Sequence, residues 1–302
     1  MIKFKKCTGF VLPLALITLA VLTVMSIGLS RMAKNHVNLA HDQLSEWQEE
    51  QIFHNTVQQL AFMFLTGQMQ PNAYIWDGTL IPIDGRWLEF EGLRIKVQDV
   101  AGMLPLQPSL SELSKIFEYY VEPAEAQQLA ATVVDWMDVD ALINPGGMEA
   151  AEYLASGLAV IPRNGPMRTL EELLNIPGIT RDNYYGDDSK IGLRDFFVLR
   201  KRGSSLNVAT TPEPLLEILA GGVRVNTRAL LRAREQEDWP ELMATLSGIG
   251  FGDEFSLNPN GEFMLDAEFV SGRKARALIR LTPEGKQAFE ILLWYFPDYE
   301  RL

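Results

Sequence analysis

The longest apolar stretch of the chain runs from Gly9 to Ser30 and contains no charged residue. Basic residues stand on both sides of it, at Lys3, Lys5, Lys6, Arg31 and Lys34. A helix of about 20 apolar residues spans the hydrocarbon core of a bilayer, and the few polar side chains inside the stretch can bond carbonyls of their own helix. The stretch therefore predicts a membrane-spanning helix near the N-terminus.

The helical pattern continues past the end of this stretch. Apolar residues recur at spacings of three, four and six from Val37 to Leu60, acidic residues fill the other faces, and no Pro or Gly follows until Gly67. The pattern predicts one helix from about Phe10 to Thr66, roughly 85 Å long. Its first half would lie in lipid, and its amphipathic second half would need a sheet to cover it. The alternative is a membrane anchor followed by an unrelated helix.

Two separated regions have strand patterns. Residues 67–85 are rich in Gly and Pro and are predicted as loop, whereas Arg86 to Val100 alternate and predict a hairpin. Three segments near the C-terminus also favour strands: Glu262 to Val270, Lys274 to Leu281 and Phe289 to Phe296. Ser271-Gly272 is a short-turn signal between the first two of these. One antiparallel sheet would gather both regions against the long helix, with the middle of the chain inserted.

The middle, from about Ser109 to Gly250, is mostly helical in pattern. Six short helices with polar caps are predicted: Ser111 to Tyr120, Glu125 to Met137, Glu149 to Ser156, Thr169 to Asn175, Thr211 to Leu219 and Trp239 to Leu246. Thr169 with Glu172 is a capping-box pattern. Asn164 and Asn207 each lead into a polar-capped helix a few residues later, which indicates two related small helical units.

Charge and cysteine content narrow the classes of function. The net charge is -12, and removing residues 1–9 would take away three lysines and no acid, leaving -15. So acidic a chain repels phosphate backbones, and nucleic acid is therefore not the expected partner. The only cysteine, Cys7, precedes the apolar stretch, which excludes a disulfide scaffold from the rest. Basic residues favour the cytoplasmic side, so the lysines before Phe10 place the C-terminal bulk outside the cytoplasm.

The densest polar cluster has two interpretations. Its oxygen-bearing residues are Asp135, Asp138, Asp140, Asn144, Glu149 and Glu152. Calcium binds six to eight oxygens on a flexible loop, and a turn at Gly146-Gly147 would bring several of them together. In the alternative, Asp138 or Asp140 ends one helix and Glu149 opens the next, where the helix dipole favours a carboxylate. The spacing is not that of an EF-hand, and both interpretations stay open.

Catalysis finds little support in the residue pattern. The three histidines, His36, His41 and His54, all fall on the long predicted helix at spacings that do not stack them. No nucleophile pairs with them, and no glycine-rich phosphate loop is present in the sequence. The chain is therefore predicted not to be an enzyme.

The junction Gly9-Phe10, directly after the lysines, resembles the class III leader of type IV pilins and type II secretion pseudopilins. In that family a membrane peptidase cuts after the Gly, and the new terminal Phe is methylated. The resemblance implies cleavage between Gly9 and Phe10 and methylation of Phe10. Most members have Glu as the fifth mature residue. Leu14 stands there in this chain, and the minor pseudopilin of the K type also lacks that Glu.

A second resemblance covers the leader through about Leu219. The motifs that carry it are Val134-Asp-Trp-Met-Asp-Val-Asp140, Gly147-Met-Glu149 with Tyr153, Asn164-Gly-Pro-Met-Arg-Thr-Leu-Glu-Glu-Leu173, Pro177-Gly178 and Leu206-Asn-Val-Ala-Thr-Thr-Pro212. In this order they resemble general secretion pathway protein K, a minor pseudopilin of type II secretion. The chain departs from the family pattern at Met148 and Thr211, where Ala is usual, and at Leu104 to Gln107, which replaces an N-L-N run.

The resemblance implies an α+β fold, in which a long N-terminal helix packs on a pilin-like antiparallel sheet with an inserted helical region of two SAM-like or helix-hairpin-helix-like units. The expected domains are the leader (1–9), the transmembrane and stalk helix (10–66), the first sheet segment (67–105), the two helical units (106–200 and 201–250) and the C-terminal strands (251–302). It also implies calcium in the helical region, with Asp138, Asp140 and Glu149 as matching ligands.

The implied function is assembly of a secretion machine. The expected partners are the minor pseudopilins I and J, the major pseudopilin, the prepilin peptidase and the inner membrane, which the chain would cross once with its bulk in the periplasm. The alternative is a membrane-anchored DNA receptor, because Leu173 to Ile179 resembles a helix-hairpin-helix turn. Acidic residues surround that turn, whereas DNA-binding proteins usually present a basic surface.

Overall fold

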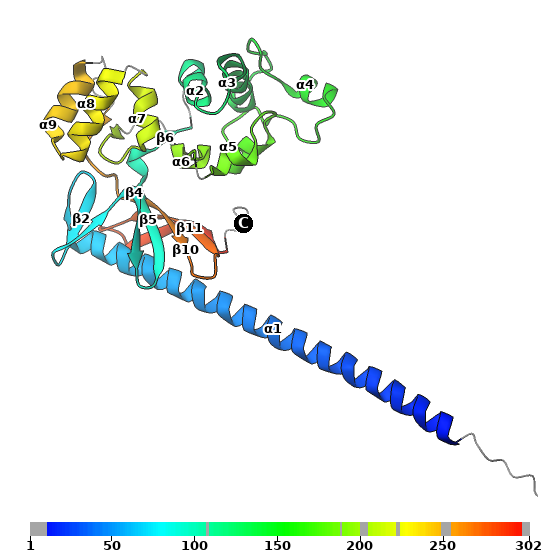
Figure 1. The fold of residues 1–302 in the computed structure, drawn as a ribbon. Coiled ribbons are helices and arrows are strands. Elements are labelled where there is room, and N and C mark those ends of the chain that lie inside the picture. Colours follow the sequence, from blue (N-terminus) through cyan, green and yellow to red (C-terminus); the bar gives the residue numbers. More distant parts are fainter. Residues whose placement is uncertain are drawn as a thin grey trace, which may run out of the picture. The chain divides into compact units, whose positions relative to one another are not determined.

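The computed structural model describes residues 11–106, 109–187, 189–199, 205–221, 224–248 and 255–297. Its first element is the helix α1, Val11–Thr66 (Figure 1). This confirms one continuous helix at the positions predicted, although Phe10 lies outside the described residues. The chain divides into two compact units, residues 1–55 and 56–302, and each is described by itself.

In the first unit, α1 is long and apolar enough to cross a membrane. Its large apolar side chains from Leu12 to Met32 are exposed, as expected of a surface that faces lipid. Two polar side chains inside the apolar stretch bond their own helix. Thr18 Oγ1 donates to the carbonyl of Ala15 (2.9 Å), and Thr23 Oγ1 donates to that of Leu19 (2.8 Å).

The second unit is built on a five-stranded antiparallel sheet. Its strands are β4 (Asp84–Phe90), β5 (Leu93–Asp99), β10 (Glu262–Glu268), β11 (Lys274–Leu281) and β12 (Phe289–Tyr295), in the order β12-β11-β10-β5-β4. The predicted hairpin and the C-terminal strands therefore meet in one sheet, where β5 pairs with β10. The last turns of α1 pack on it through buried Val57, Leu60 and Phe64. The Phe64 ring lies 4.7 Å from that of Phe263 on β10.

Residues 67–85 are not a loop, contrary to the sequence-based prediction. Residues 68–82 form a second, three-stranded sheet of β1 (Gln68–Met69), β2 (Ala73–Trp76) and β3 (Thr79–Pro82), and Asp84 and Gly85 begin β4. Asp77-Gly78 joins β2 to β3 with positive φ angles of 46° and 76°, the conformation of a tight hairpin turn. Pro82 ends its strand, where proline is tolerated. The prolines and glycines in this segment therefore mark turns and a strand end.

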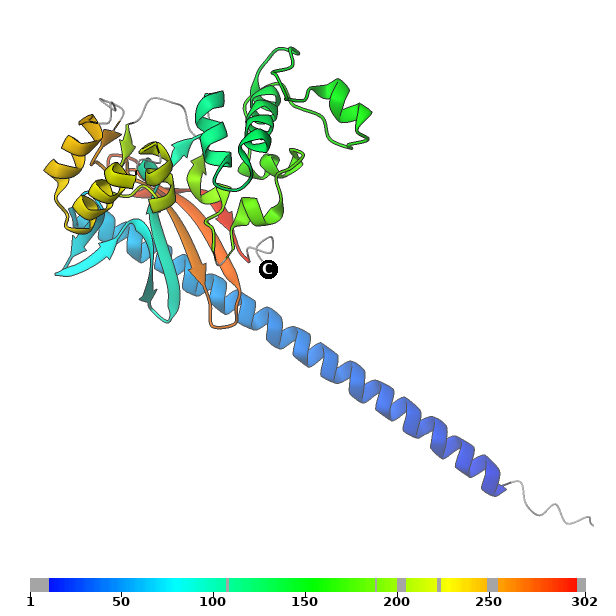
Figure 2. The same cartoon turned by 45° about the horizontal axis from the view of Figure 1, so that its top comes forward.

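Two groups of helices lie between β5 and β10 in the sequence (Figures 1 and 2). The first helical group is α2 (Leu110–Phe117), α3 (Pro123–Met137), α4 (Ala150–Ala155), the 3-10 helix η2 (Leu170–Asn175), α5 (Arg181–Tyr185) and α6 (Leu193–Phe196). The second is α7 (Glu213–Leu219), α8 (Arg224–Glu235) and α9 (Trp239–Gly248). Each group has its own buried apolar core. Each of the six predicted helices overlaps one of these elements, whereas α5, α6 and α8 were not predicted.

Short connections join these groups to the sheet. A 3-10 turn η1 (Val100–Gly102) follows β5, and β6 (Leu104–Pro105) then pairs in parallel with β7 (Phe197–Val198). In the same way β8 (Leu206–Asn207) pairs with β9 (Phe255–Ser256).

Only half of the capping box predicted at Thr169 forms, because the Glu172 carboxylate accepts from the Thr169 backbone amide. The Thr169 side chain makes no cap bond to η2. The Glu172 carboxylate also accepts from Arg163, from the Arg168 amide and from Trp136 Nε1. A capping box does form at α2, between Ser109 and Glu112.

Candidate cation centre

The densest polar cluster of the sequence lies where α3 ends and α4 begins. Asp135 is on the last turns of α3, Asp138 is its C-terminal cap, and Glu149 precedes α4. Asp135 Oδ1 folds the intervening loop back by accepting from the Asn144 backbone amide (3.1 Å) and from Asn144 Nδ2 (2.5 Å). The predicted fold-back of this loop therefore occurs, and it brings Glu149 toward the end of α3.

Gly147 permits the close approach of this loop. A Cβ atom at Gly147 would lie 2.0 Å from Asp135 Oδ2, well inside any allowed contact. The neighbouring Gly146 has a positive φ of 85°, which favours glycine. The two glycines thus let the loop cover the buried Asp135 carboxylate.

Four buried oxygen atoms of this cluster have no hydrogen-bond partner. They are Asp135 Oδ2, Asp138 Oδ1, Glu149 Oε1 and the Tyr153 hydroxyl. Buried polar atoms are nearly always paired in native proteins, so each exception needs an explanation. Three of these oxygens belong to carboxylates of one short segment, and carboxylate oxygens are ligands that calcium prefers.

The electrostatics of the cluster agree with this interpretation. Burial raises the pKa of Asp138, and the charges of Asp140 and Asp135 raise it further. Burial likewise raises the pKa of Glu149, and Asp135 and Asp138 add to the shift although a hydrogen bond from Asn164 opposes it. Carboxylates that repel one another in this way favour either a proton or a cation between them.

The three predicted ligands differ in what they offer. Asp138 and Glu149 each present an unpaired buried oxygen, whereas the Asp140 side chain accepts from the amide of Leu142 (2.8 Å). The Asp140 backbone carbonyl accepts from Asn164 Nδ2 (2.6 Å). Within the described ranges no group of three His, Cys, Asp or Glu side chains lies where it could hold a metal ion. We give the unpaired oxygens more weight than the missing shell. Side-chain rotation can bring ligands together around an ion, whereas burying a carboxylate oxygen without a partner costs free energy in the folded state.

Asp135 belongs to this centre and was not among the predicted ligands. The position of Asp135 in the sequence fits either a ligand or a residue of a buried helix. It stands three residues before Asp138, which is one helical turn, yet it falls in the apolar pattern of a buried helix. The capping alternative also describes part of the site, since Asp138 and Glu149 do occupy the ends of helices.

A neighbouring set of contacts joins α3 to η2. Trp136 Nε1 donates to Glu172 (3.2 Å), and Arg163 forms an ion pair with the same carboxylate (2.9 Å). Burial alone would raise the pKa of Glu172, but the hydrogen bonds and the Arg163 charge outweigh it and hold the pKa below its ordinary value. The predicted motif residues Trp136 and Glu172 thus fix the helices that frame the centre.

A second polar cluster surrounds Asp99 at the end of β5. This carboxylate is fully buried and accepts from Asn207 Nδ2 (2.8 Å), Thr210 Oγ1 (3.1 Å) and the Ala101 amide (3.1 Å). Asn207 Nδ2 also donates to the carbonyl of Pro71 (3.0 Å). The motif Leu206 to Pro212 therefore serves as the joint between the sheets and the second helical group.

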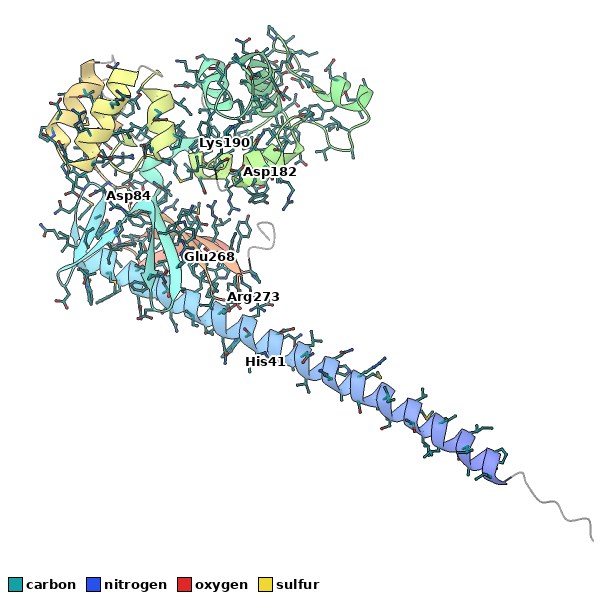
Figure 3. The ribbon with its side chains drawn as sticks, viewed as in Figure 1. His41, Asp84, Asp182, Lys190, Glu268 and Arg273 are labelled. Atoms are coloured by element: carbon teal, nitrogen blue, oxygen red, sulfur yellow. The ribbon has the colours of Figure 1, made fainter. Side chains whose placement is uncertain are left out.

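The remaining predicted sites lie elsewhere. Gly9 and Phe10 are outside the described residues. All three histidines lie on α1, and His41 is exposed there (Figure 3). In the turn that resembles a helix-hairpin-helix, Leu173, Ile176 and Ile179 are buried in the core of the first helical group, so these residues pack helices together. The absence of DNA binding stays a prediction.

The cation centre lies within a stretch of the chain that matches a protein-family model. Residues 109–185 match the family model described as type II secretion system (T2SS), protein K. No curated protein matches the chain. Among solved structures, the fold is similar to a chain of the GspK-GspI-GspJ complex from the enterotoxigenic Escherichia coli type 2 secretion system. That match has a TM-score of 0.54 and 18% identity, and it covers 84% of this chain and 97% of the other.

Proposed function

We propose that the chain belongs to the type II secretion system protein K family and that it is a minor pseudopilin at the tip of the pseudopilus. There it would initiate assembly and support protein secretion across the outer membrane. The role is one of assembly and not of catalysis.

The observation that carries this proposal is that the two ends of α1 have different surroundings. One uninterrupted helix has an exposed apolar half that is long enough to cross a membrane. Its final turns instead bury Val57, Leu60 and Phe64 against a sheet. A helix built in this way serves both as an anchor and as a spine on which similar subunits stack side by side. The chain also shares its fold with a chain of the GspK-GspI-GspJ complex, which supports the same proposal.

The partners follow from this role. We propose that the pseudopilins I and J bind the chain at the tip, with the major pseudopilin below. The prepilin peptidase removes residues 1–9, and the chain crosses the inner membrane once with its bulk in the periplasm. Leu14 fits the tip, because no subunit above it would offer a terminal amine for a carboxylate to balance.

N-terminal sequencing and mass measurement of the membrane-extracted protein test the leader. We expect a chain that starts at methylated Phe10. The variant Gly9→Leu should remain uncut, whereas the control Gly28→Leu should be cut normally, since open space surrounds Gly28 within the helix. An intact Met1, or a cut after Ser30, would contradict the pseudopilin assignment. Co-purification with the I and J proteins from the same host then tests the partners.

We also propose that calcium binds the centre at the end of α3. The residues that would hold it are Asp138, Glu149 and Asp135 through their unpaired oxygens, with Asp140 beside them. Bound calcium supplies positive charge that offsets the carboxylates and ties the loop 138–149 to α3. The protein's part is to hold these oxygens out of water on a loop that Gly147 allows to fold back.

A thermal unfolding measurement tests calcium. At a concentration about 100 times the Kd, a bound ion stabilises the folded state by about 2.7 kcal/mol, so calcium should raise the Tm of the wild type. The double variant D138N/E149Q should lose that increase, whereas the exposed-site control D182N should keep it. An equal increase in all three proteins would remove the proposed site while leaving the pseudopilin role untouched.

A further inference from the structure

One row of side chains crosses all five strands of the main sheet. Lys96 on β5 lies opposite Asp266 on β10, and Asp266 lies opposite Arg276 on β11. Trp87 on β4 and Tyr295 on β12 continue the row to the two edges. Directly opposed residues share one face of a sheet, and the alternation along β10 places this face opposite the one that Phe64 of α1 contacts through Phe263.

The central part of this row carries an unbalanced charge. Asp266 binds both cations, with Arg276 Nε at 2.5 Å and Lys96 Nζ at 3.2 Å. Two positive charges against one negative charge leave an excess of one. The side chains of Arg276 and Asp266 are only 3% and 4% exposed, and that of Lys96 is 13% exposed. Since an uncompensated buried charge is strongly unfavourable, this row requires one further carboxylate.

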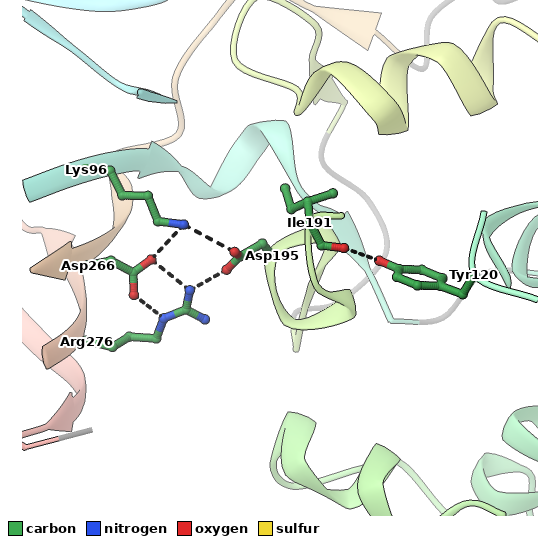
Figure 4. Close-up of polar contacts among 6 residues, drawn as sticks. All are labelled: Lys96, Tyr120, Ile191, Asp195, Asp266 and Arg276. Atoms are coloured by element: carbon green, nitrogen blue, oxygen red, sulfur yellow. Dashed lines mark hydrogen bonds and ion pairs between the residues drawn. The ribbon is translucent and has the colours of Figure 1, made fainter. Parts of the chain in front are cut away.

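Asp195 on α6 supplies that carboxylate (Figure 4). Its Oδ2 accepts from Lys96 Nζ at 3.2 Å, and its Oδ1 accepts from Arg276 Nη2. Burial alone would lower the pKa of Arg276, but Asp266 and Asp195 together hold it well above its ordinary value. Two carboxylates thus balance the two cations. The second carboxylate, Asp195, comes from the first helical group and not from the sheet.

The element that carries Asp195 has little stability of its own. The helix α6 is a single turn of four residues, and one turn is not stable without tertiary contacts. It leads directly into β7, which pairs with β6 beside the sheet. A second contact from the same row reaches the first helical group, where Tyr295 Oη lies 3.3 Å from Glu171 Oε1.

We propose that the row Lys96-Asp266-Arg276 is a carboxylate-binding site that the chain fills from within, and that Asp195 is the latch holding the first helical group on the sheet. The latch is local. Without it, Asp266 still pairs with both cations and the strands stay together, while α6 and β7 lose their ion pairs to the sheet. An external carboxylate of similar shape would then fit the vacated position.

Hydrogen exchange on the full chain in detergent micelles tests the latch. The variant Asp195→Asn keeps the side-chain shape and removes the charge, and Asp182→Asn is the matched control at an exposed position on α5 (Figure 3). In D195N we expect the amides of α6 and β7 to exchange at least about tenfold faster, with those of β10 and β11 unchanged. D182N should behave as the wild type.

Chemical rescue tests the carboxylate site. In Asp195→Ala, sodium acetate should slow the exchange of α6 and β7, whereas sodium chloride at equal ionic strength should not. If D195A does not fold, the acetate rescue is made in D195N, and K96M tests the latch from the sheet, with a smaller local acceleration of exchange expected. Equal exchange in D195N and D182N would overturn the latch, as would uniform acceleration of the whole unit. Acetate that acts no better than chloride would overturn the carboxylate site.

Discussion

Asp99 should make the stability of the protein depend on pH in a measurable way. The group is fully buried, and burial raises its pKa from 3.8 to about 6, although the hydrogen bonds from Asn207, Ala101 and Thr210 partly oppose the shift. The folded state therefore binds this proton more tightly than the unfolded state. Stability from this proton is fully present below the unfolded pKa and is lost as pH rises through the folded one.

The magnitude follows from the two pKa values. A shift of about two units at about 1.4 kcal/mol per unit amounts to about 3 kcal/mol over the full titration, most of it between pH 4 and pH 7.5. For a unit of this size, 1 kcal/mol corresponds to roughly 2–4 °C in Tm, so the effect is about 6–12 °C. Other groups titrate over the same range, and the useful quantity is therefore the difference between the wild type and Asp99→Asn, which cannot ionise.

The assay is thermal unfolding of the full chain in detergent, followed by tryptophan fluorescence from pH 4 to pH 8. We expect the Tm of the wild type to fall relative to that of D99N as pH rises through about 6. The control D182N removes an exposed carboxylate and should track the wild type. A wild-type minus D99N difference that stays constant across this range would refute the reasoning, whatever its absolute size.

Two further predictions concern the helices around the cation centre. Gly147→Ala places a Cβ 2.0 Å from Asp135 Oδ2 and should destabilise the protein by about 1–3 kcal/mol in chemical denaturation, whereas Gly165→Ala, with open space around it, should cost much less. Trp136→Phe removes the N–H that donates to Glu172 and should cost about 1–3 kcal/mol; an unchanged unfolding midpoint would show that this bond contributes nothing to stability.

The sequence predicted the elements whose pattern is long and regular. The helix α1 and the strands β5, β10 and β11 follow directly from the periodicity of their apolar residues. The second sheet was missed because Gly and Pro between Gly67 and Gly85 were taken as loop, although Asp77-Gly78 is a strong hairpin signal. The helix α8 was missed because its many arginines hide its apolar face.

The polar sites were harder to predict, because they depend on which strands and loops meet. Local spacing left Asp138 and Glu149 open between calcium ligands and helix caps, and each has a buried oxygen without a hydrogen-bond partner. Asp195 could not be predicted in this way. Its importance depends on the register that aligns Lys96, Asp266 and Arg276 across three strands, and no local pattern encodes that register.

The adjacency of β5 and β10 has a consequence for how such a chain can change over evolution. Asp99 at the end of β5 lies opposite Phe263 near the start of β10, so everything between them stands where a hairpin would have its turn. Material can be lengthened, shortened or exchanged at such a point without disturbing the ladder on either side. The sheet can therefore stay the same in related proteins while the region inserted between β5 and β10 differs.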